Sequence, residues 1–329
     1  MRRRDLFVAI GGAVAWPLAL RAQQASLRRI AVLIGFPQDN AEAQKWVKAF
    51  LDGLSPLGWR PDTNLHIDWR FTSDPAQMEE LAKEVVQTQP DLIVSTTTPW
   101  TGAVLRETHT IPVVFAAVSD PVGSGFVQSV SRPGGNATGF INIEASVAGK
   151  WLEVLKEIAP STARVAVVFN PKTAPQSFYY LQALRASAET LGFTVVAVQV
   201  ATTEEVEAAI NDLAKIPDSG LVLTPDIFTA TQPRLDLIIS LASRLHIPAV
   251  YPFVFYVKAG GLVSYGADNT DLLRRATAYV DRVLKGEKPE DLPVQLPTKF
   301  ELAINTRTAA TMGLKFPASL LATADEVIE

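Results

Sequence analysis

Residues 164–172, RVAVVFNPK, repeat the pattern of residues 29–37, RIAVLIGFP. Each stretch is an apolar run of β-forming residues that ends in a loop marked by proline. Amphipathic helix patterns follow at residues 43–59 and 177–193, and both end in Leu-Gly-aromatic. A glycine in that position is a natural helix C-cap. The two halves of the chain therefore predict two similar lobes.

The repeat continues in the same order along both halves. The run DLIVSTTTP at residues 91–99 corresponds to SGLVLTPDIF at residues 219–228, and an Ile-Pro pair precedes a further strand at Ile111 and again at Ile247. Strands that alternate with helices form a parallel sheet with helices on both faces. We therefore expect an α/β protein with two doubly wound parallel-sheet lobes, which would bind a ligand at the carboxyl ends of their strands.

The last third of the chain has no counterpart in the first half. Its pattern predicts a strand at residues 260–266, an amphipathic helix at residues 269–286 and an extended segment at residues 294–305. These pieces are expected to join the lobes, so that the chain crosses a multi-strand hinge more than once.

Residues 1–22 have the layout of a bacterial export signal. The basic start MRRRDLF precedes an apolar stretch too short to span a membrane, and the small Ala22 suits a cleavage point. Arg3 and Arg4 resemble a twin-arginine signal; a general secretory signal and a buried N-terminal helix are the alternatives, and the helix is disfavoured because the segment has no amphipathic face. Cysteine is absent, so we expect neither disulfides nor a lipid anchor.

Composition and motifs argue against several functional classes. The chain has a formal net charge of −4 and no basic patch, which argues against a nucleic-acid partner. The sequence has no metal-ligand spacing, no phosphate-binding glycine loop and no nucleophile elbow. We therefore expect no metal, no cofactor and no catalytic residue, and interpret the chain as a binding protein rather than an enzyme.

Four long strings carry a resemblance to a known family. They are SDPVGSGFVQS at residues 119–129, RPGGNATG at residues 132–139, YPFVFYVKAGGLVSYG at residues 251–266 and KGEKPEDLPVQLPTKFELAIN at residues 285–305. With them, essentially the whole mature chain resembles the substrate-binding proteins of ABC importers, in the subfamily with the type-I periplasmic-binding fold.

The resemblance implies a periplasmic protein that traps a small solute between two lobes and delivers it to an ABC permease in the inner membrane. Some relatives bind tryptophan or tyrosine. By the family's pattern, residues 28–140 plus 267–292 form the first lobe, and residues 141–266 plus 293–329 form the second. We expect a monomer.

A run of threonines is the first candidate ligand site. Thr96, Thr97 and Thr98 follow an apolar strand and precede Pro99, a residue favoured at the first position of a helix. A helix N-terminus offers unpaired N–H groups and partial positive charge, which favour a carboxylate. We interpret the threonines as a carboxylate-binding site; an ordinary helix cap is the alternative.

Acidic side chains at other strand ends are candidates for binding an amine. Asp226 follows a strand of the second lobe, and Ser119 and Asp120 follow a strand of the first. Because the threonines suit an anion, Asp226 is the candidate partner of a ligand ammonium. Both aspartates have the alternative role of capping a helix.

Aromatic side chains at strand ends predict the walls of the site. Phe36 belongs to the first lobe, while Phe169, Tyr251 and Phe253 belong to the second, where the polar Asn170 follows Phe169 at the same strand end as a further candidate. Such rings can stack on a ligand ring, and packing in the core is their alternative role. The combined pattern suits a zwitterionic amino acid with an aromatic or apolar side chain; a carboxylate without an amine and a nucleobase-like ring remain open.

Two other functions compete with transport. The same fold can serve as a ligand-sensing partner of a membrane receptor. A two-domain α/β enzyme, such as a glycosyltransferase-like protein, would need a cofactor motif or a catalytic constellation, and neither is present in the sequence.

Overall fold

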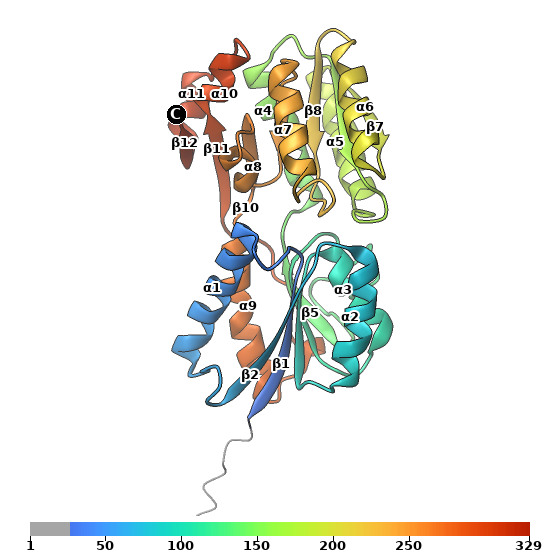
Figure 1. The fold of residues 1–329 in the computed structure, drawn as a ribbon, viewed down its shortest axis with the longest axis vertical. Coiled ribbons are helices and arrows are strands. Elements are labelled where there is room, and N and C mark those ends of the chain that lie inside the picture. Colours follow the sequence, from blue (N-terminus) through green and yellow to red (C-terminus); the bar gives the residue numbers. More distant parts are fainter. Residues whose placement is uncertain (1–26) are drawn as a thin grey trace, which may run out of the picture.

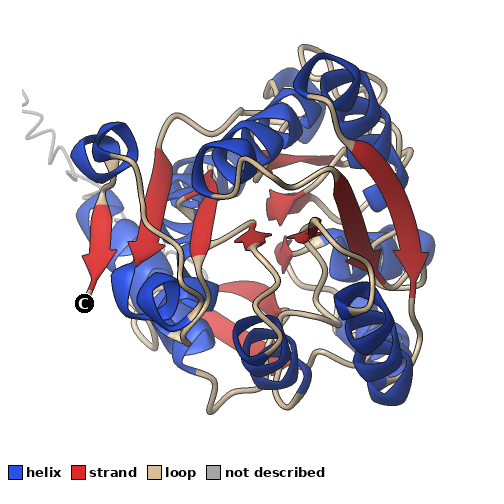
Figure 2. Cartoon of the chain, turned by 90° about the horizontal axis from the view of Figure 1, so that it is seen from above, coloured by secondary structure: helices blue, strands red, loops and turns tan. Residues whose placement is uncertain are grey.

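The computed structural model describes residues 27–329, and the predicted export signal at residues 1–22 lies outside them. The described chain forms two lobes, each built on one β-sheet (Figure 1). Seen from above, helices surround the strands (Figure 2). The predicted α/β fold class is therefore confirmed.

The first lobe contains a five-stranded parallel sheet in the order β2-β1-β3-β4-β5. Strands β3 and β4 are buried along their whole length, as expected for a sheet covered on both faces. The elements of this lobe are β1 (Arg28–Ile34), α1 (Ala41–Leu54), the 3₁₀ turn η1 (Ser55–Leu57), β2 (Leu65–Phe71), α2 (Pro75–Gln87), β3 (Leu92–Thr96), α3 (Thr98–Glu107), β4 (Val113–Val118) and β5 (Ala137–Ile141).

The second lobe contains a seven-stranded sheet in the order β12-β11-β10-β9-β8-β6-β7, in which only the β10–β11 pair is antiparallel. Its elements are α4 (Ala145–Ile158), β6 (Arg164–Phe169), α5 (Ser177–Leu191), β7 (Thr194–Gln199), α6 (Thr203–Ala214), β8 (Ser219–Leu223), α7 (Arg234–Arg244), β9 (Ala249–Tyr251), α8 (Val254–Lys258), β10 (Val263–Ala267), β11 (Phe300–Asn305), α10 (Thr306–Thr311), α11 (Ala318–Thr323) and β12 (Glu326–Ile328).

The strand orders confirm that the lobes repeat one another. The order β2-β1-β3-β4-β5 in the first lobe corresponds to β7-β6-β8-β9-β10 in the second. The glycines predicted as C-caps also correspond, because Gly58 and Gly192 both have the left-handed backbone that ends a helix.

Helix α9 (Asn269–Leu284) leaves the second sheet and returns to the first lobe. There it packs against α1, β4 and β5, and the Trp59 indole donates a hydrogen bond to Asp281 across a 2.9 Å distance. The chain then passes through the 3₁₀ turn η2 (Pro289–Asp291) and returns to the second lobe at β11. The lobes are thus joined by three chain crossings, after β5, after β10 and before β11.

The last crossing is held to the first lobe before it leaves. The Gln295 amide donates to the Gly139 carbonyl at 2.8 Å, and the Gln295 carbonyl accepts from the Ile141 amide at 2.9 Å. The predicted lobe boundaries at residues 140–141, 266–267 and 292–293 stay a prediction about which segments move together.

We expect Gly266→Ala to lower the free energy of unfolding by about 1–3 kcal/mol, the usual cost of overpacking. A Cβ at Gly266 would lie 1.9 Å from the backbone oxygen of Pro252, so the backbone at this crossing would have to shift. Urea unfolding measures the effect. Gly135→Ala is the matched control, because a Cβ there meets no atom within 4 Å; equal stability of the two variants would contradict the prediction.

Candidate functional site

The carboxyl ends of strands from both lobes face one another and enclose a cavity of about 40 Å³. Its walls combine polar groups with aromatic rings. The first lobe contributes Phe36, Trp46, Thr97, Thr98, Pro99, Ala117, Ser119 and Asn269, the crossing after β5 contributes Asn142, and the second lobe contributes Thr173, Gln176, Pro225, Asp226, Ile227, Ala230, Phe253 and Phe255. We refer to this space as the central cavity.

Thr97 is held in an unfavourable backbone conformation at the central cavity. It has φ 65° and ψ 155° at the N-cap of α3, and its side chain caps no helix amide. A β-branched residue at positive φ is a genuine outlier, and strain of this kind concentrates at functional sites. No capping hydrogen bond from the Thr97 side chain therefore offsets the free-energy cost of this backbone conformation.

Three buried polar atoms at the central cavity lack hydrogen-bond partners within residues 27–329. They are Thr97 Oγ1, Gln176 Oε1 and Asn269 Oδ1, contributed by both lobes. Leaving a buried polar group unsatisfied costs about 1–3 kcal/mol. Three such groups around one small space indicate a site built to be completed by a polar molecule.

Asp226 is the charged residue of the central cavity, and its side chain is almost fully buried. Its carboxylate accepts from the Asn170 amide at 2.8 Å, the Thr173 hydroxyl at 2.5 Å and the Phe228 amide at 2.9 Å. Burial raises the pKa of Asp226 to about 6, while these hydrogen bonds and nearby Arg234 oppose the rise. A carboxylate has about four acceptor positions, so one remains for a ligand donor.

An aromatic wall crosses the central cavity from one lobe to the other. The Phe36 ring meets Trp46 edge-on with 5.2 Å between ring centroids, and it meets Phe255 of the second lobe edge-on at 6.1 Å. Phe253 stacks on Phe255 at 5.8 Å. These geometries are favourable for aromatic pairs and leave ring faces and edges for a ligand ring.

The structure brings six of the eleven predicted site residues together at the central cavity. These six are Phe36, Thr97, Thr98, Ser119, Asp226 and Phe253. The other five, Thr96, Asp120, Phe169, Asn170 and Tyr251, do not line it.

Two of the five make local hydrogen bonds in the first lobe. The Thr96 hydroxyl accepts from the Gly35 amide and donates to the Leu33 carbonyl, both at 2.9 Å, so it ties β3 to β1. Asp120 accepts from the Gly123 amide at 2.9 Å and caps a turn outside the cavity. This contact supports the capping role, which is the alternative to amine binding that the sequence leaves open for Asp120.

The remaining three belong to the second lobe. Phe169 and Tyr251 are fully buried in hydrophobic clusters, and Tyr251 stacks on Tyr256 at 5.1 Å between ring centroids. The backbone N–H of Asn170 donates a hydrogen bond to the Asp226 carboxylate, so Asn170 contacts a residue that lines the cavity.

Sequence reasoning missed several cavity residues. Asn142 and Asn269 lie just after β5 and β10, so the rule that ligands bind beyond strand ends also pointed to them. Thr173 and Gln176 lie in the loop between β6 and α5, four and seven residues after the end of the strand, and no local pattern marks them.

Within residues 27–329, no group of three or more His, Cys, Asp or Glu side chains is close enough to hold a metal ion. Among the helices of the same residues, none combines the length and the apolar character needed to cross a membrane.

Comparison with known proteins adds independent findings. A family model described as ABC transporter substrate binding protein matches residues 30–328. A tyrosine-binding protein of Clostridioides difficile strain R20291 is 27% identical over 288 residues, covering 86% of this chain and 81% of that protein.

Two solved structures are similar in fold and sequence. An ABC domain from Streptococcus pneumoniae in complex with L-Trp has a TM-score of 0.82 at 27% identity, covering 92% of this chain and all of that one. A ligand-free, open substrate-binding protein with adhesive properties from Clostridium difficile has a TM-score of 0.68 at 25% identity, covering 92% of this chain and 99% of that one.

Adjacent threonines provide a matched stability test. We expect Thr96→Val to lower the free energy of unfolding by about 1–3 kcal/mol, because the Gly35 amide loses its acceptor. Thr97→Val removes a buried hydroxyl that has no partner among residues 27–329, so the free energy of unfolding should rise by about 1–3 kcal/mol. Urea unfolding of both variants tests the assignment. A loss of stability in Thr97→Val would mean that its hydroxyl is structural.

Proposed function

The chain belongs to the ABC transporter substrate-binding protein family, and we propose that it binds an aromatic amino acid in the central cavity. The observation that carries the proposal is the set of unpartnered polar atoms there, combined with one buried carboxylate and an aromatic wall. The Thr97 hydroxyl at the start of α3 suits the ligand carboxylate, the Asp226 carboxylate suits its ammonium, and the aromatic wall suits its ring. The tyrosine-binding relative and the L-Trp complex support the same class of ligand.

The ligand carboxylate would bind at the N-terminus of α3. Thr97 offers its hydroxyl there, and the helix adds partial positive charge. The ammonium would donate to the free acceptor position of Asp226 in the other lobe. The ring would pack on Phe253 and Phe255. Because the ligand contacts both lobes, binding would favour the closed arrangement over the open one.

The described arrangement of the lobes is close to closed. The central cavity measures about 40 Å³, whereas ligand pockets usually measure about 300–1,000 Å³. At nearly equal identity, the fold matches the L-Trp complex better than the ligand-free open relative. We therefore propose that the lobes open to admit the ligand, with residues 28–140 plus 267–292 and residues 141–266 plus 293–329 as the moving bodies.

An ABC importer's binding protein works outside the cytoplasmic membrane, and we propose the periplasm for this chain. It would act there as a monomer and pass its ligand to the permease of its importer. The net charge of −4 is consistent with a small-molecule ligand rather than a nucleic acid.

We expect affinity for tryptophan and tyrosine to fall as the pH drops below about 6. Burial raises the pKa of Asp226 to about 6, and protonation removes the negative charge that attracts the ammonium, leaving a weaker neutral acceptor. Calorimetry between pH 5 and pH 8 measures the effect. Asp226→Asn should weaken binding at pH 7.5 at least tenfold and flatten the pH dependence.

Asp120→Asn is the matched control, because Asp120 lies outside the central cavity and caps a turn. Its affinity should equal that of the unmodified protein at every pH. If Asp226→Asn fails to fold, the pH dependence of the unmodified protein remains the test. Affinity for both amino acids that does not change between pH 5 and pH 8 would refute the assignment of Asp226.

A further inference from the structure

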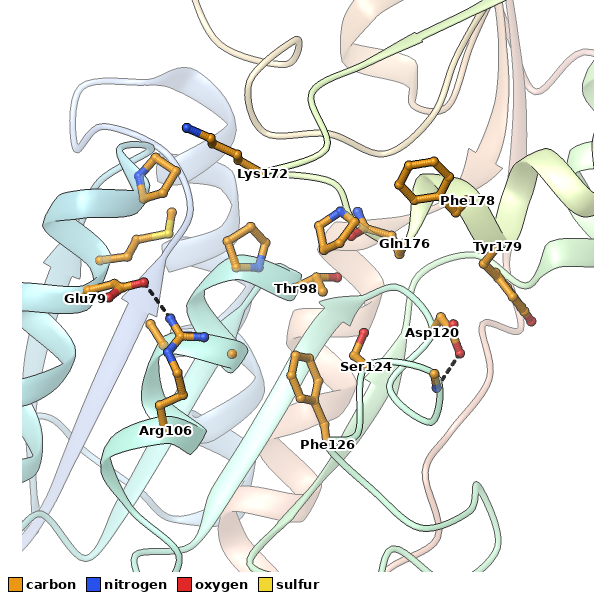
Figure 3. Close-up of a pocket in the computed structure, with 17 residues that line it drawn as sticks. Glu79, Thr98, Arg106, Asp120, Ser124, Phe126, Lys172, Gln176, Phe178 and Tyr179 are labelled. Carbon is orange, nitrogen blue, oxygen red and sulfur yellow. Dashed lines mark hydrogen bonds and ion pairs between the residues drawn. The ribbon is translucent and has the colours of Figure 1, made fainter. Parts of the chain in front are cut away.

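A second, larger space adjoins the central cavity. It measures about 520 Å³ and lies between α3 and the turn after β4 in the first lobe and residues 172–179 in the second (Figure 3). Gly102, Phe126, Gln176 and Phe178 are among its lining residues. We refer to this space as the vestibule.

The vestibule and the central cavity share part of their walls. Thr98, Pro99 and Gln176 line both spaces, so a molecule in the cavity can extend into the vestibule between them. On the opposite side, a space of about 480 Å³ shares Phe36, Ala230 and Phe255 with the cavity, and the Phe36 and Phe255 rings meet there edge-on at 6.1 Å across the lobes. The vestibule is the larger of these two adjoining spaces and the one that Gln176 lines.

Gln176 offers an acceptor at this junction. Its side chain is 7% exposed, and its Nε2 donates to the Pro225 carbonyl at 2.9 Å, which orients the amide group. Its Oε1 has no donor among residues 27–329. In the proposed pose all the N–H groups on the backbone of a free amino acid belong to the ammonium at Asp226. The carboxylate end, which lies at the start of α3 next to the vestibule, carries no N–H. A peptide N–H following the first residue would supply the donor that Gln176 lacks.

We propose, on the basis of the proposed function, that the ligand extends beyond a free amino acid: an N-terminal aromatic residue occupies the central cavity, and a second, amide-linked residue occupies the vestibule. The peptide N–H donates to Gln176 Oε1. The vestibule volume of about 520 Å³ lies within the usual range of about 300–1,000 Å³ for ligand pockets.

The chemistry of the vestibule suits the second residue of a dipeptide. Phe178 is 49% exposed at its margin and would be covered by that residue. Lys172 lies on the other side of the vestibule from Phe178 (Figure 3) and forms no ion pair within residues 27–329.

Calorimetry with L-tryptophan, L-tryptophanamide and L-tryptophyl-glycine tests the proposal, with the corresponding tyrosine compounds in parallel. The amide and the dipeptide both lack the free carboxylate of the first residue, but only the dipeptide reaches the vestibule. We expect the dipeptide to bind at least tenfold more tightly than the amide. Equal affinities of the two would overturn the inference while binding of the free amino acid upholds the proposed function; no binding of any compound would overturn both.

Gly102 provides the matched variants, because it lines the vestibule but not the central cavity. A Cβ at this position meets the nearest atoms at 3.5 Å, an ordinary contact distance. Gly102→Ala should preserve binding of both ligands. Gly102→Leu should fill the vestibule and weaken the dipeptide at least tenfold, with less than a twofold change for tryptophan. A Gly102→Leu variant in which the dipeptide loses no more affinity than tryptophan would overturn the inference.

Discussion

The candidate site depends on one constraint: the carboxyl ends of two parallel sheets face each other across a single space. Parallel strands leave polar loops and helix N-termini at that edge of each sheet. Two lobes with the same strand order therefore present similar edges to one another. Both edges line the central cavity, with Thr97 at the start of α3 in one lobe and Asp226 after β8 in the other.

The polar groups of the site reduce the stability of the ligand-free protein. Thr97 keeps a strained backbone, and burial opposes the ionisation of Asp226, whose pKa rises to about 6. Three buried oxygens at the central cavity also lack donors among residues 27–329. A ligand that completes these interactions stabilises the closed protein, because binding energy recovers what the empty site loses. The strained Thr97 backbone and the unpartnered oxygens are therefore features expected of a preformed binding site.

The three chain crossings give this arrangement its mechanical basis. Helix α9 belongs to the first lobe by packing, although it follows β10 of the second lobe in sequence. Residue 295 is hydrogen-bonded to β5 before the chain enters β11. Several connections close together restrict the lobes to rotation about a common region, which is how hinge proteins open and close. In the described arrangement Phe36 of the first lobe and Phe255 of the second meet edge-on.

The sequence alone determined the duplicated α/β architecture, because alternating strands and helices and their glycine caps are local patterns. It also predicted Thr97, Ser119 and Asp226 as site residues because each follows a strand end, and all three line the central cavity. The sequence could not distinguish these residues from Thr96, Phe169 and Tyr251, which also stand at strand ends. In the structure Thr96 makes local hydrogen bonds, and Phe169 and Tyr251 are buried in the core. Only the tertiary structure decided which side chains reach the central cavity, and it added Gln176 and Asn269 to them. The physical reason is that a site between two lobes is formed by contacts between residues far apart in the chain.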